Sequence, residues 1–489
     1  MHKIHIKHIA YFIIAAMMAY YADALAENLS LDLKNDEISY VEKISKATYR
    51  GLDSMVDPQT GWPVNSASIS KDGLAIPVFK VVSVDCVGLR MVSLIGARNI
   101  GSVDNKEMVA QLEKIVATFE KVEKWNGFFY QWYSLVDKDA NGNPKRVQLG
   151  DLSEDFIPSL NNSILTASLM VMVEYLDEAS AGLSRADPER RALIELKKRC
   201  QALIDKQDYS IFYDKKIGFM RLGIEAKPGE KTNGVKGSGF HYEHFYTEAN
   251  LLALIAAVKG DVPRDVWDNL RRGKVTYKTG EGRELIFYRS WNGSIYEGFF
   301  ADLFINYNKN AASSLGASSR NLILAEKDYS DRHGLPFWGW SPAANDPKKY
   351  NPDIGSKQPV YYIMWGVDEF GEGTPGGTKA VSPYSSLLAL KFAPYAAIKN
   401  LKRIQEIPGA YSDNYGFVDA IYVDDATPYP CLVSWDQLIS EIACQNYISD
   451  IEGRKGIDHY FLSYIDKMGK LGRRLLAQPN TADSLISSN

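Results

Sequence analysis

The apolar residues of this chain recur mainly with the period of an α-helix. In the segment 106–125 they return every three or four positions and form one stripe, made of Met108, Leu112, Ile115, Phe119 and Val122. Such a stripe is typical of an amphipathic helix that packs one face on a core. The same pattern predicts helices over residues 163–176, 190–203, 245–258, 318–331, 385–394, 396–407, 435–448 and 459–471.

The succession of these helices predicts one all-α domain over residues 27–475. No break in composition separates them, and loops rich in Gly, Pro, Asn and Asp, such as 137–144 and 345–355, join them. We expect helical hairpins that close into a toroid with long loops at one mouth. An open solenoid is the alternative, and the lack of a repeat of fixed period counts against it. Short apolar pieces such as 360–364 predict minor β hairpins within the loops.

Residues 1–26 have the three parts of a secretory signal peptide. Lys3 and Lys7 precede the nearly apolar run 9–22, and small residues two apart follow in Ala24-Leu25-Ala26. A membrane anchor is the alternative, but the run is shorter than the roughly 20 residues that span a bilayer. We expect cleavage after Ala26, a periplasmic or secreted protein, and no stable membrane insertion. The polar residues 476–489 are expected to form a frayed tail.

Composition excludes several classes of function. The 60 acidic and 56 basic residues are well mixed, which leaves no basic patch for nucleic acid. Four widely spaced cysteines allow three pairings, between which the sequence cannot choose. Scarce histidine and the lack of zinc, P-loop and dinucleotide motifs predict no metal and no cofactor. Aromatic residues make up 12% of the chain, which suits a cleft where sugar rings stack on aromatic faces.

Two carboxylates lie in segments whose aromatic neighbours suit acid–base chemistry. Glycoside hydrolysis needs one protonated acid for the leaving oxygen and one base or nucleophile. Glu248 follows Phe245 and Tyr246 and precedes an aliphatic run, and apolar neighbours keep an acid protonated. Its alternative is a surface pair with His244 one turn earlier. Glu297 precedes Gly-Phe-Phe and is the second candidate, with a helix N-terminal charge as its alternative.

Further acidic, aromatic and polar residues, from segments that are also rich in aromatic residues, complete the candidate site. Glu154 and Asp155 precede Phe156 and are candidates for the base or nucleophile, although capping of the next helix is the favoured interpretation. Asp85 is expected to be a buried cap. The candidate substrate-binding residues are aromatic, polar or acidic: Tyr130, Trp132, Asn161, Tyr242, His244, Trp291, Trp338, Trp340, Asp346 and Asp436.

Seven short motifs, in collinear order, resemble those of the bacterial glucoamylase-like family, which includes endo-β-1,2-glucanases and domains of cyclic β-1,2-glucan synthases. They are G-F-F-Y at 127–130, the segment 152–165, Y-T-E-A at 246–249, S-W-N-G-S-I-Y-E at 290–297, P-F-W-G-W-S at 336–341, Y-G-F-V-D-A at 415–420, and D-Q at 436–437 with N-Y at 446–447. The resemblance implies an (α/α)6 toroid that cleaves or transfers β-1,2-glucans with acidic residues. It favours Glu248 first and Glu297 second.

The chain departs from this family at three positions that carry a carboxylate in its relatives. Asn161 stands in place of Asp, and Pro342 and Gln445 stand in place of Glu. The leading interpretation is a glycoside hydrolase for a β-linked bacterial glucan or exopolysaccharide. In it Glu248 protonates the leaving oxygen and Asp155 or Glu154 activates water. The rivals are a non-catalytic saccharide-binding component of polysaccharide assembly or export, and a polysaccharide lyase.

Overall fold

Six helices form the interior of the molecule. The structure, a computed structural model, describes residues 35–150, 152–346, 361–373 and 376–477. These six helices are buried along most or all of their residues: α2 (Val84–Asn99), α4 (Ser159–Ala181), α6 (Ala249–Val258), α8 (Ile295–Phe299), α13 (Pro383–Ala389) and α15 (Ser434–Ile451). The four-residue helix α9 (Asp302–Ile305) is also buried. A helix without a solvent-facing stripe belongs in a protein interior. We call these six the inner helices.

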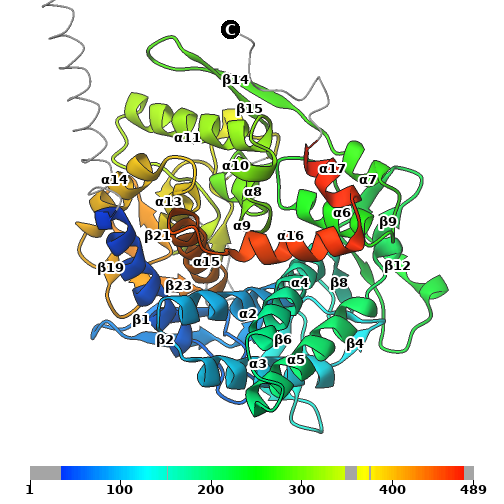
Figure 1. Ribbon diagram of the computed structural model, residues 1–489. Coiled ribbons are helices and arrows are strands. Elements are labelled where there is room, and N and C mark those ends of the chain that lie inside the picture. The colour runs from blue at the N-terminus through cyan, green and yellow to red at the C-terminus, as the bar shows by residue number, and fades with distance from the viewer. Residues whose placement is uncertain (1–34, 151, 347–360, 374–375, 478–489) are drawn as a thin grey trace, which may run out of the picture.

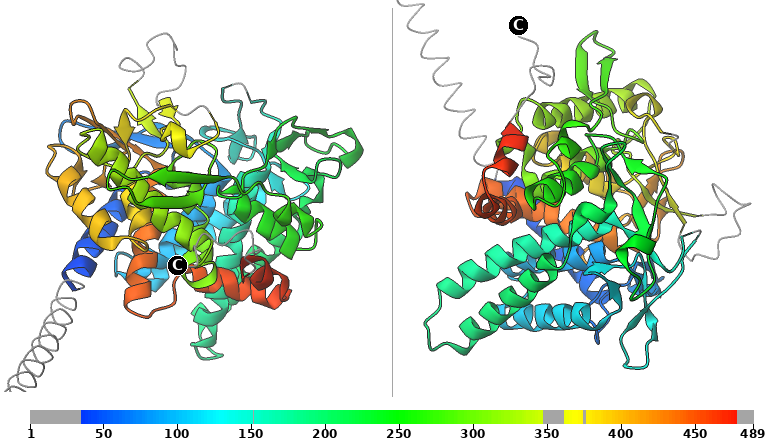
Figure 2. Two further views of the ribbon diagram at one scale, coloured as in Figure 1. Left: turned by 90° about the horizontal axis from the view of Figure 1, so that it is seen from above. Right: turned by 90° about the vertical axis from the view of Figure 1, so that its right-hand side faces the viewer.

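A second group of helices buries only one stripe and lies outside the first. It comprises α3 (Asn105–Lys121), α5 (Pro188–Asp205), α11 (Leu315–Arg332) and α14 (Pro394–Gln405). Figure 1 shows these four helices around the periphery. The hairpin of α4 and α5 projects from the body of the molecule in the right-hand view of Figure 2. All four stripes were predicted from the sequence, with ends that differ by a few residues.

Direct packing links the inner helices in a chain of neighbours. α2 contacts α4 and α15, α4 contacts α6, and α13 contacts both α15 and α8. Near the C-terminus, α16 (Ile457–Met468) packs on α4 and on the short helix α9 (Asp302–Ile305). The predicted helix 459–471 is in fact two, because Gly469, with φ of +128°, separates α16 from α17 (Leu471–Ala477).

A short strand precedes each inner helix, so the expected all-α class needs correction. These strands are β3 (Val81–Val82), β8 (Phe156–Pro158), β13 (His241–Tyr242), β15 (Glu284–Tyr288), β18 (Ala380–Val381) and β23 (Cys431–Val433). They belong to small antiparallel sheets of two or three strands. The fold is therefore mainly helical with minor sheets. Strands of two to five residues are too short to show the alternation that reveals a strand in sequence.

The sheets gather loops that lie far apart in the chain. β1 (Ser66–Ile69) pairs with β2 (Ala75–Phe79) and, 365 residues later, with β23, in the register Ser66 to Val433. β6 (Tyr133–Lys138) pairs with β3 and with β7 (Pro144–Arg146), so the predicted loop 137–144 is the turn of a hairpin. The predicted strand around 360–364 is confirmed as β17 (Tyr361–Ile363), which pairs with β16 (Ala343–Asn345). These pairings fix the loops at the start of the inner helices.

Several predictions concern the ends of the chain. The expected signal peptide 1–26 and residues 478–489 of the expected tail lie outside the described residues, whereas Leu476 and Ala477 belong to α17. Within the part of the chain that the structure describes, no helix is both long and apolar enough to cross a bilayer. All four cysteines are buried and free, so none of the three possible pairings is formed.

Candidate active site

The polar candidates are concentrated in the first turns of the inner helices. Asp85 is the second residue of α2, and Asn161, Glu297 and Asp436 are the third residues of α4, α8 and α15. Glu248 is the residue directly before α6. A helix N-terminus carries free backbone N–H groups and the positive end of the helix dipole, which favour carboxylates. The fold therefore places acids from distant parts of the sequence at helix starts.

A cavity of about 430 Å³ lies beside the starts of α2, α4 and α15. Its polar wall includes Asp85 and Asn161, and its aromatic wall consists of Phe79, Trp132, Tyr362 and Trp435. The volume falls in the range of small-ligand sites, and an apolar wall with a few placed polar groups is typical of them. Of the residues predicted from sequence, Trp132 and Asn161 line this cavity.

Glu248 has the environment of a general acid. The residue is half-buried, and its Oε2 atom is buried without a hydrogen-bond partner. Burial raises the pKa of Glu248 to about 7. Because burial penalises the charged form, a large fraction of the carboxyl group holds its proton at neutral pH. Such a group can donate a proton to a leaving oxygen.

Glu297 lies next to Glu248 and shares its electrostatic environment. Its Oε2 accepts a hydrogen bond of 2.8 Å from the backbone N–H of Asn292, and Ser294 caps the helix through the N–H of Glu297. Burial and then the charge of Glu248 raise the pKa of Glu297 to about 8. Two carboxyl groups that repel each other cannot both ionise readily, so the pair retains a proton near neutral pH.

A close backbone crossing holds the loop that binds Glu297. Gly293 has φ of +71°, and a Cβ atom there would lie 2.3 Å from the carbonyl oxygen of Val367. A Cβ at Gly366 would lie 2.0 Å from the carbonyl oxygen of Asn292. Glycine is required on both sides of this crossing, since any side chain would force the two segments apart. The segment 366–371 thereby fixes the position of the Asn292 N–H group, which donates a hydrogen bond to Glu297.

Asp85 lines the cavity and is held by three donors. Its Oδ1 accepts from the Ser83 hydroxyl and from the Cys86 N–H at 2.9 Å, and its Oδ2 accepts from the Asn161 amide at 2.7 Å. Burial raises the pKa of Asp85 to about 6, and the three donors oppose that rise. The expected burial is confirmed, but the cap of α2 is Ser83, and Asp85 lies within the first turn. The position at the cavity was not predicted.

Asp436 lies behind the aromatic wall, paired with a second acid. The Tyr362 hydroxyl donates to Asp436 Oδ1 at 2.7 Å, and Asp419 is the neighbouring carboxyl group. Burial and then Asp419 raise the pKa of Asp436 well above its usual range, while burial raises the pKa of Asp419 to about 6. The pair therefore retains a proton. Tyr362, not Asp436, forms the cavity surface at this point.

Glu248 and Glu297 are not among the residues that line the cavity, but two tyrosines lie within electrostatic reach of both Glu248 and the cavity residue Asp85. Burial raises the pKa of Tyr242, and the charges of Glu248 and Asp85 raise it further. Burial also raises the pKa of Tyr296, and the charges of Glu248, Tyr384 and Asp85 raise it further. Both carboxyl groups therefore lie within electrostatic reach of the same two phenol rings. Tyr296 also packs against Trp435, with ring centroids 6.4 Å apart, which places it at the aromatic wall.

The structure places Glu154 and Asp155 in an ion cluster. Asp155 forms a close ion pair with Arg146, and Glu154 lies 3.9 Å from the same guanidinium. Arg146 also stacks over the ring of Tyr130, whose hydroxyl donates to the carbonyl of Ala226 at 3.1 Å. Tyr130 is fully buried, and neither acid is among the cavity-lining residues. Their catalytic role stays a prediction, and the ion cluster with Arg146 gives both acids a structural role.

The remaining predicted residues lie around or beneath the site. Trp340 is fully buried against Tyr329, and Trp338 is nearly so, so both rings belong to the core and offer no free face to a sugar. Trp291 is 41% exposed. His244 Nδ1 lies 3.6 Å from Glu372.

Asp346 donates its backbone N–H to the Tyr422 hydroxyl at 2.9 Å. Together with Trp291 and His244, it stays a predicted substrate contact. Among the described residues no cluster of three or more His, Cys, Asp or Glu side chains is arranged to hold a metal ion.

The three departures from the family have different surroundings. Asn161 binds Asp85 at the cavity. Gln445 donates to the Ser45 hydroxyl at 2.8 Å deep in α15, and the Pro342 carbonyl accepts from Tyr384 at 2.8 Å. Only the change at Asn161 therefore alters a group on the cavity wall, and there the neighbouring Asp85 supplies a carboxylate.

Comparisons with known proteins confirm the resemblance to the glucoamylase-like family. Residues 240–452 match the family described as "Putative glucoamylase". The cyclic β-(1,2)-glucan synthase NdvB of Rhizobium meliloti (strain 1021) is 22% identical over 506 aligned positions, which cover 81% of this chain. The chain spans 17% of the length of that curated relative.

Solved structures show the same fold. An endo-β-1,2-glucanase from Chitinophaga pinensis, in complex with sophorotriose and glucose, has a TM-score of 0.67 at 14% identity, over 90% of this chain and 97% of the other. An endo-β-1,2-glucanase variant from Talaromyces funiculosus, in complex with β-1,2-glucan, has a TM-score of 0.71 at 13% identity, over 93% and 92%. At this identity the similarity establishes the fold alone.

Sequence reasoning missed several residues of the site. Tyr362 and Trp435 were noted only as parts of a strand and a helix, and Asp419 only as part of a motif. Their signal was weak because each is placed by contacts with distant segments, such as that of Tyr362 with Asp436. One signal was available: an amide or acid lies at or just before the start of two predicted helices, at Asn161 before 163–176 and at Asp436 in 435–448.

Proposed function

We propose that this chain is a glycoside hydrolase that cleaves a bacterial β-glucan, with β-1,2-glucan as the first substrate to test. The observation that carries the proposal is Glu248, whose Oε2 is buried, unpartnered and attached to a carboxyl group with a raised pKa. A second carboxyl group, Asp85, lines an aromatic-walled cavity, and it acts on the same tyrosine, Tyr242, as Glu248 does. The names of the similar proteins supply the substrate class.

The proposed chemistry uses the proton that burial keeps on Glu248. Glu248 donates it to the glycosidic oxygen as the bond to the anomeric carbon breaks, which avoids an unstable alkoxide leaving group. Burial keeps the proton on Glu248, and the charge that Glu248 gains on ionisation raises the pKa of the neighbouring Glu297. The rings of Trp132 and Trp435 would stack on sugar faces, as aromatic walls do in carbohydrate sites.

The architecture and location of the protein are part of the same proposal. The packing order of the inner helices and the outer position of α3, α5, α11 and α14 support an (α/α)6 toroid. The tripartite pattern of residues 1–26 supports export to the periplasm or the medium. Export would bring the protein to extracytoplasmic glucans.

The decisive experiment is release of new reducing ends by the purified protein. Linear β-1,2-glucan is compared with β-1,3-, β-1,4- and β-1,6-glucans, and the E248Q variant serves as control. We expect reducing ends from the β-1,2-glucan and none with E248Q. Glucan binding without reducing ends would instead identify a saccharide-binding component. Products with ultraviolet absorbance from a new double bond would identify a lyase, and either result would overturn the proposal.

A further inference from the structure

The carboxyl group of Asp85 is surrounded by uncharged donors and borders the cavity. Its three hydrogen bonds come from the Ser83 hydroxyl, the Cys86 N–H and the Asn161 amide. Hydrogen bonds that are donated to a carboxyl group favour its ionised form, and so does a position in the first turn of a helix. Asp85 occupies such a position in α2.

The other acids of the site have surroundings that favour the protonated form. Glu248 lacks a donor to Oε2, and Glu297 is repelled by Glu248. Asp436 lies against Asp419, so this pair shares a proton. A base must be ionised before it can accept a proton from water. Among these acids Asp85 is the one that both lines the cavity and is supplied with donors from three directions.

We propose that Asp85 is the general base of the hydrolysis and that Asn161 is a positioning residue that holds its carboxylate at the cavity wall. This inference rests on the proposed function. Asp85 takes a proton from a water molecule, whose oxygen forms a bond to the anomeric carbon. The bond from that carbon to the leaving oxygen breaks, its electron pair stays on the oxygen, and Glu248 supplies the proton. Attack opposite the leaving group inverts the anomeric configuration.

The groups around Asp85 determine how Asn161 can be tested. Cys86 on the same helix, Tyr242 before α6, Tyr296 on α8 and Asp436 on α15 are the titratable neighbours of this region. The contact from α4 is the neutral amide of Asn161. A carboxylate at position 161 would place a like charge 2.7 Å from Asp85 and raise its pKa.

The first arm of the experiment removes the base and replaces it. D85A should lower kcat on β-1,2-glucan about 10³-fold, which is within the usual contribution of a general base. Sodium azide should restore activity at least tenfold, because azide attacks the anomeric carbon without losing a proton. Proton NMR should show a product of inverted configuration for the wild type, and a glycosyl azide of the same configuration for D85A.

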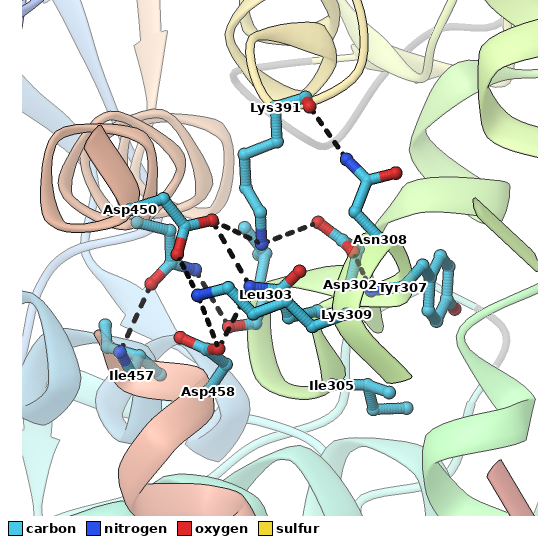
Figure 3. A network of polar contacts seen from close by, with 12 residues as sticks. Asp302, Leu303, Ile305, Tyr307, Asn308, Lys309, Lys391, Asp450, Ile457 and Asp458 are labelled. Carbon is cyan, nitrogen blue, oxygen red and sulfur yellow. Dashed lines mark hydrogen bonds and ion pairs between the residues drawn. The ribbon is translucent and has the colours of Figure 1, made fainter. Parts of the chain in front are cut away.

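Asp458 supplies a matched control for this variant. Like Asp85, it is buried in the first turn of a helix, and it accepts a hydrogen bond from an asparagine amide, that of Asn306, at 3.0 Å. Figure 3 shows Asp458 beside Lys309 in a separate polar network, and Asp458 does not line the cavity. D458N should therefore keep kcat within about twofold of the wild type.

The second arm uses the pH profile, which a merely structural role would not move. N161D should shift the acidic limb of kcat/KM upward by about one pH unit, since like charges at hydrogen-bond distance raise a carboxyl pKa. N161A should lower kcat about tenfold with little change in KM, because loss of one oriented hydrogen bond affects the base more than substrate binding. Circular dichroism and thermal unfolding verify that each variant is folded.

The outcomes separate this assignment from the proposed function. If the wild type cleaves β-1,2-glucan while D85A keeps more than a tenth of its activity, Asp85 is not the base and the hydrolase remains. Retention of configuration, or a folded N161D variant with an unmoved acidic limb, would also overturn the assignment. If the wild type releases no reducing ends from any glucan of the panel, both proposals are overturned together.

Discussion

The two ends of the inner helices carry acids in different electrostatic settings. Helix α15 shows both, with Asp436 in its first turn and Asp450 fourteen residues later, roughly 21 Å away at about 1.5 Å per residue. Asp450 lies in the network of Figure 3, where Lys309 approaches it at 2.5 Å and Lys391 at 3.9 Å. Among the described residues, the polar neighbours of the Asp436 carboxyl group are the Tyr362 hydroxyl and a second acid, Asp419.

The other acids at the two ends differ in the same respect, which is the presence or absence of a neighbouring cation. Lys391 is almost fully buried and lies 3.2 Å from Asp302, which is buried as well. At the cavity end, no lysine or arginine among the described residues forms an ion pair with Glu248, Glu297, Asp85 or Asp436. A buried acid with a cation can remain charged and stabilise the fold, whereas one without a cation tends to keep its proton. In the proposed mechanism the first arrangement stabilises the fold and the second supplies the groups for acid–base chemistry.

The largest effect is expected at the cavity end. E248Q should lower kcat on β-1,2-glucan by about 10³-fold, because the amide has no acidic proton for the leaving oxygen. The fold should persist, since Glu248 Oε2 makes no hydrogen bond. Reducing-end release by the folded variant measures this directly. Activity within tenfold of the wild type would remove Glu248 from the mechanism.

At the opposite end the expected effect is on stability. K391M should lower the free energy of unfolding by about 3 kcal/mol, because it leaves buried Asp302 without its cation. The matched control is K309M, whose side chain is 58% exposed and whose loss should cost less than about 1 kcal/mol. Urea unfolding measures both. Equal losses of unfolding free energy in K391M and K309M would contradict the structural role of Lys391. A lower kcat per folded K391M molecule would contradict the view that this end of the helices is not catalytic.

Stability should also depend on pH through Glu297. The pKa of Glu297 is about 8 in the folded protein and about 4.5 ordinarily, so between these values the folded state holds a proton that the unfolded state releases. The free energy of unfolding should therefore fall as pH rises from about 4.5 to about 8, by up to about 1.4 kcal/mol per unit. E297Q cannot titrate there and should show a flatter dependence. Denaturant titrations from pH 5 to pH 8 measure the unfolding free energy of the wild type and of E297Q. The same pH dependence in both proteins would refute the role of Glu297.

A smaller effect on activity is expected when a ring of the aromatic wall of the cavity is removed. W132A should raise KM about fivefold with kcat within about twofold, since stacking on a ring contributes about 1 kcal/mol to binding. W340F is the control, because Trp340 is fully buried and its change should reduce stability and leave KM unaltered. Steady-state kinetics on β-1,2-linked oligosaccharides compares the two. An unchanged KM for W132A would exclude this wall as a subsite.

The smallest effect on kcat is expected at Asp155, the base candidate from sequence that the structure places in an ion cluster. D155N should change kcat less than about threefold, because Asp155 is paired with Arg146 and does not line the cavity. The comparison with D85A on the same substrate decides between the two candidate bases. A loss for D155N that matched the loss for D85A would restore the prediction made from sequence.

Helices with a polar face could be predicted from sequence, as could the buried helices α4, α6, α13 and α15, whereas α2, α8 and most strands were not predicted. The stripe of α3 is clear because its other face is polar. Helix α2 was not predicted, since its residues from Val84 to Ala97 are all buried and show no stripe. The strands before the inner helices depend on partners far along the chain, such as β1 with β23. Local patterns cannot contain that information.

The candidate site was predictable only in part, for a similar reason. Glu248 could be found because its apolar neighbours are adjacent in sequence. Asp85 could be identified only as a cap, because its second role depends on Asn161, which is 76 residues away. Trp338 and Trp340 lie in an aromatic motif that looks like a sugar-binding segment, yet their rings pack into the core. Exposure of a ring cannot be deduced from the motif that contains it.

The most direct test of the division between the two helix ends is a crystal structure of E248Q with a β-1,2-linked gluco-oligosaccharide. We predict a sugar chain across the cavity, with a glycosidic oxygen within about 3 Å of the side chain at position 248. On the opposite face of the same sugar ring, Asp85 should contact a water molecule that is aligned with the anomeric carbon. An oligosaccharide bound away from these helix starts, or with Asp85 out of reach of that water, would contradict the acid–base assignment.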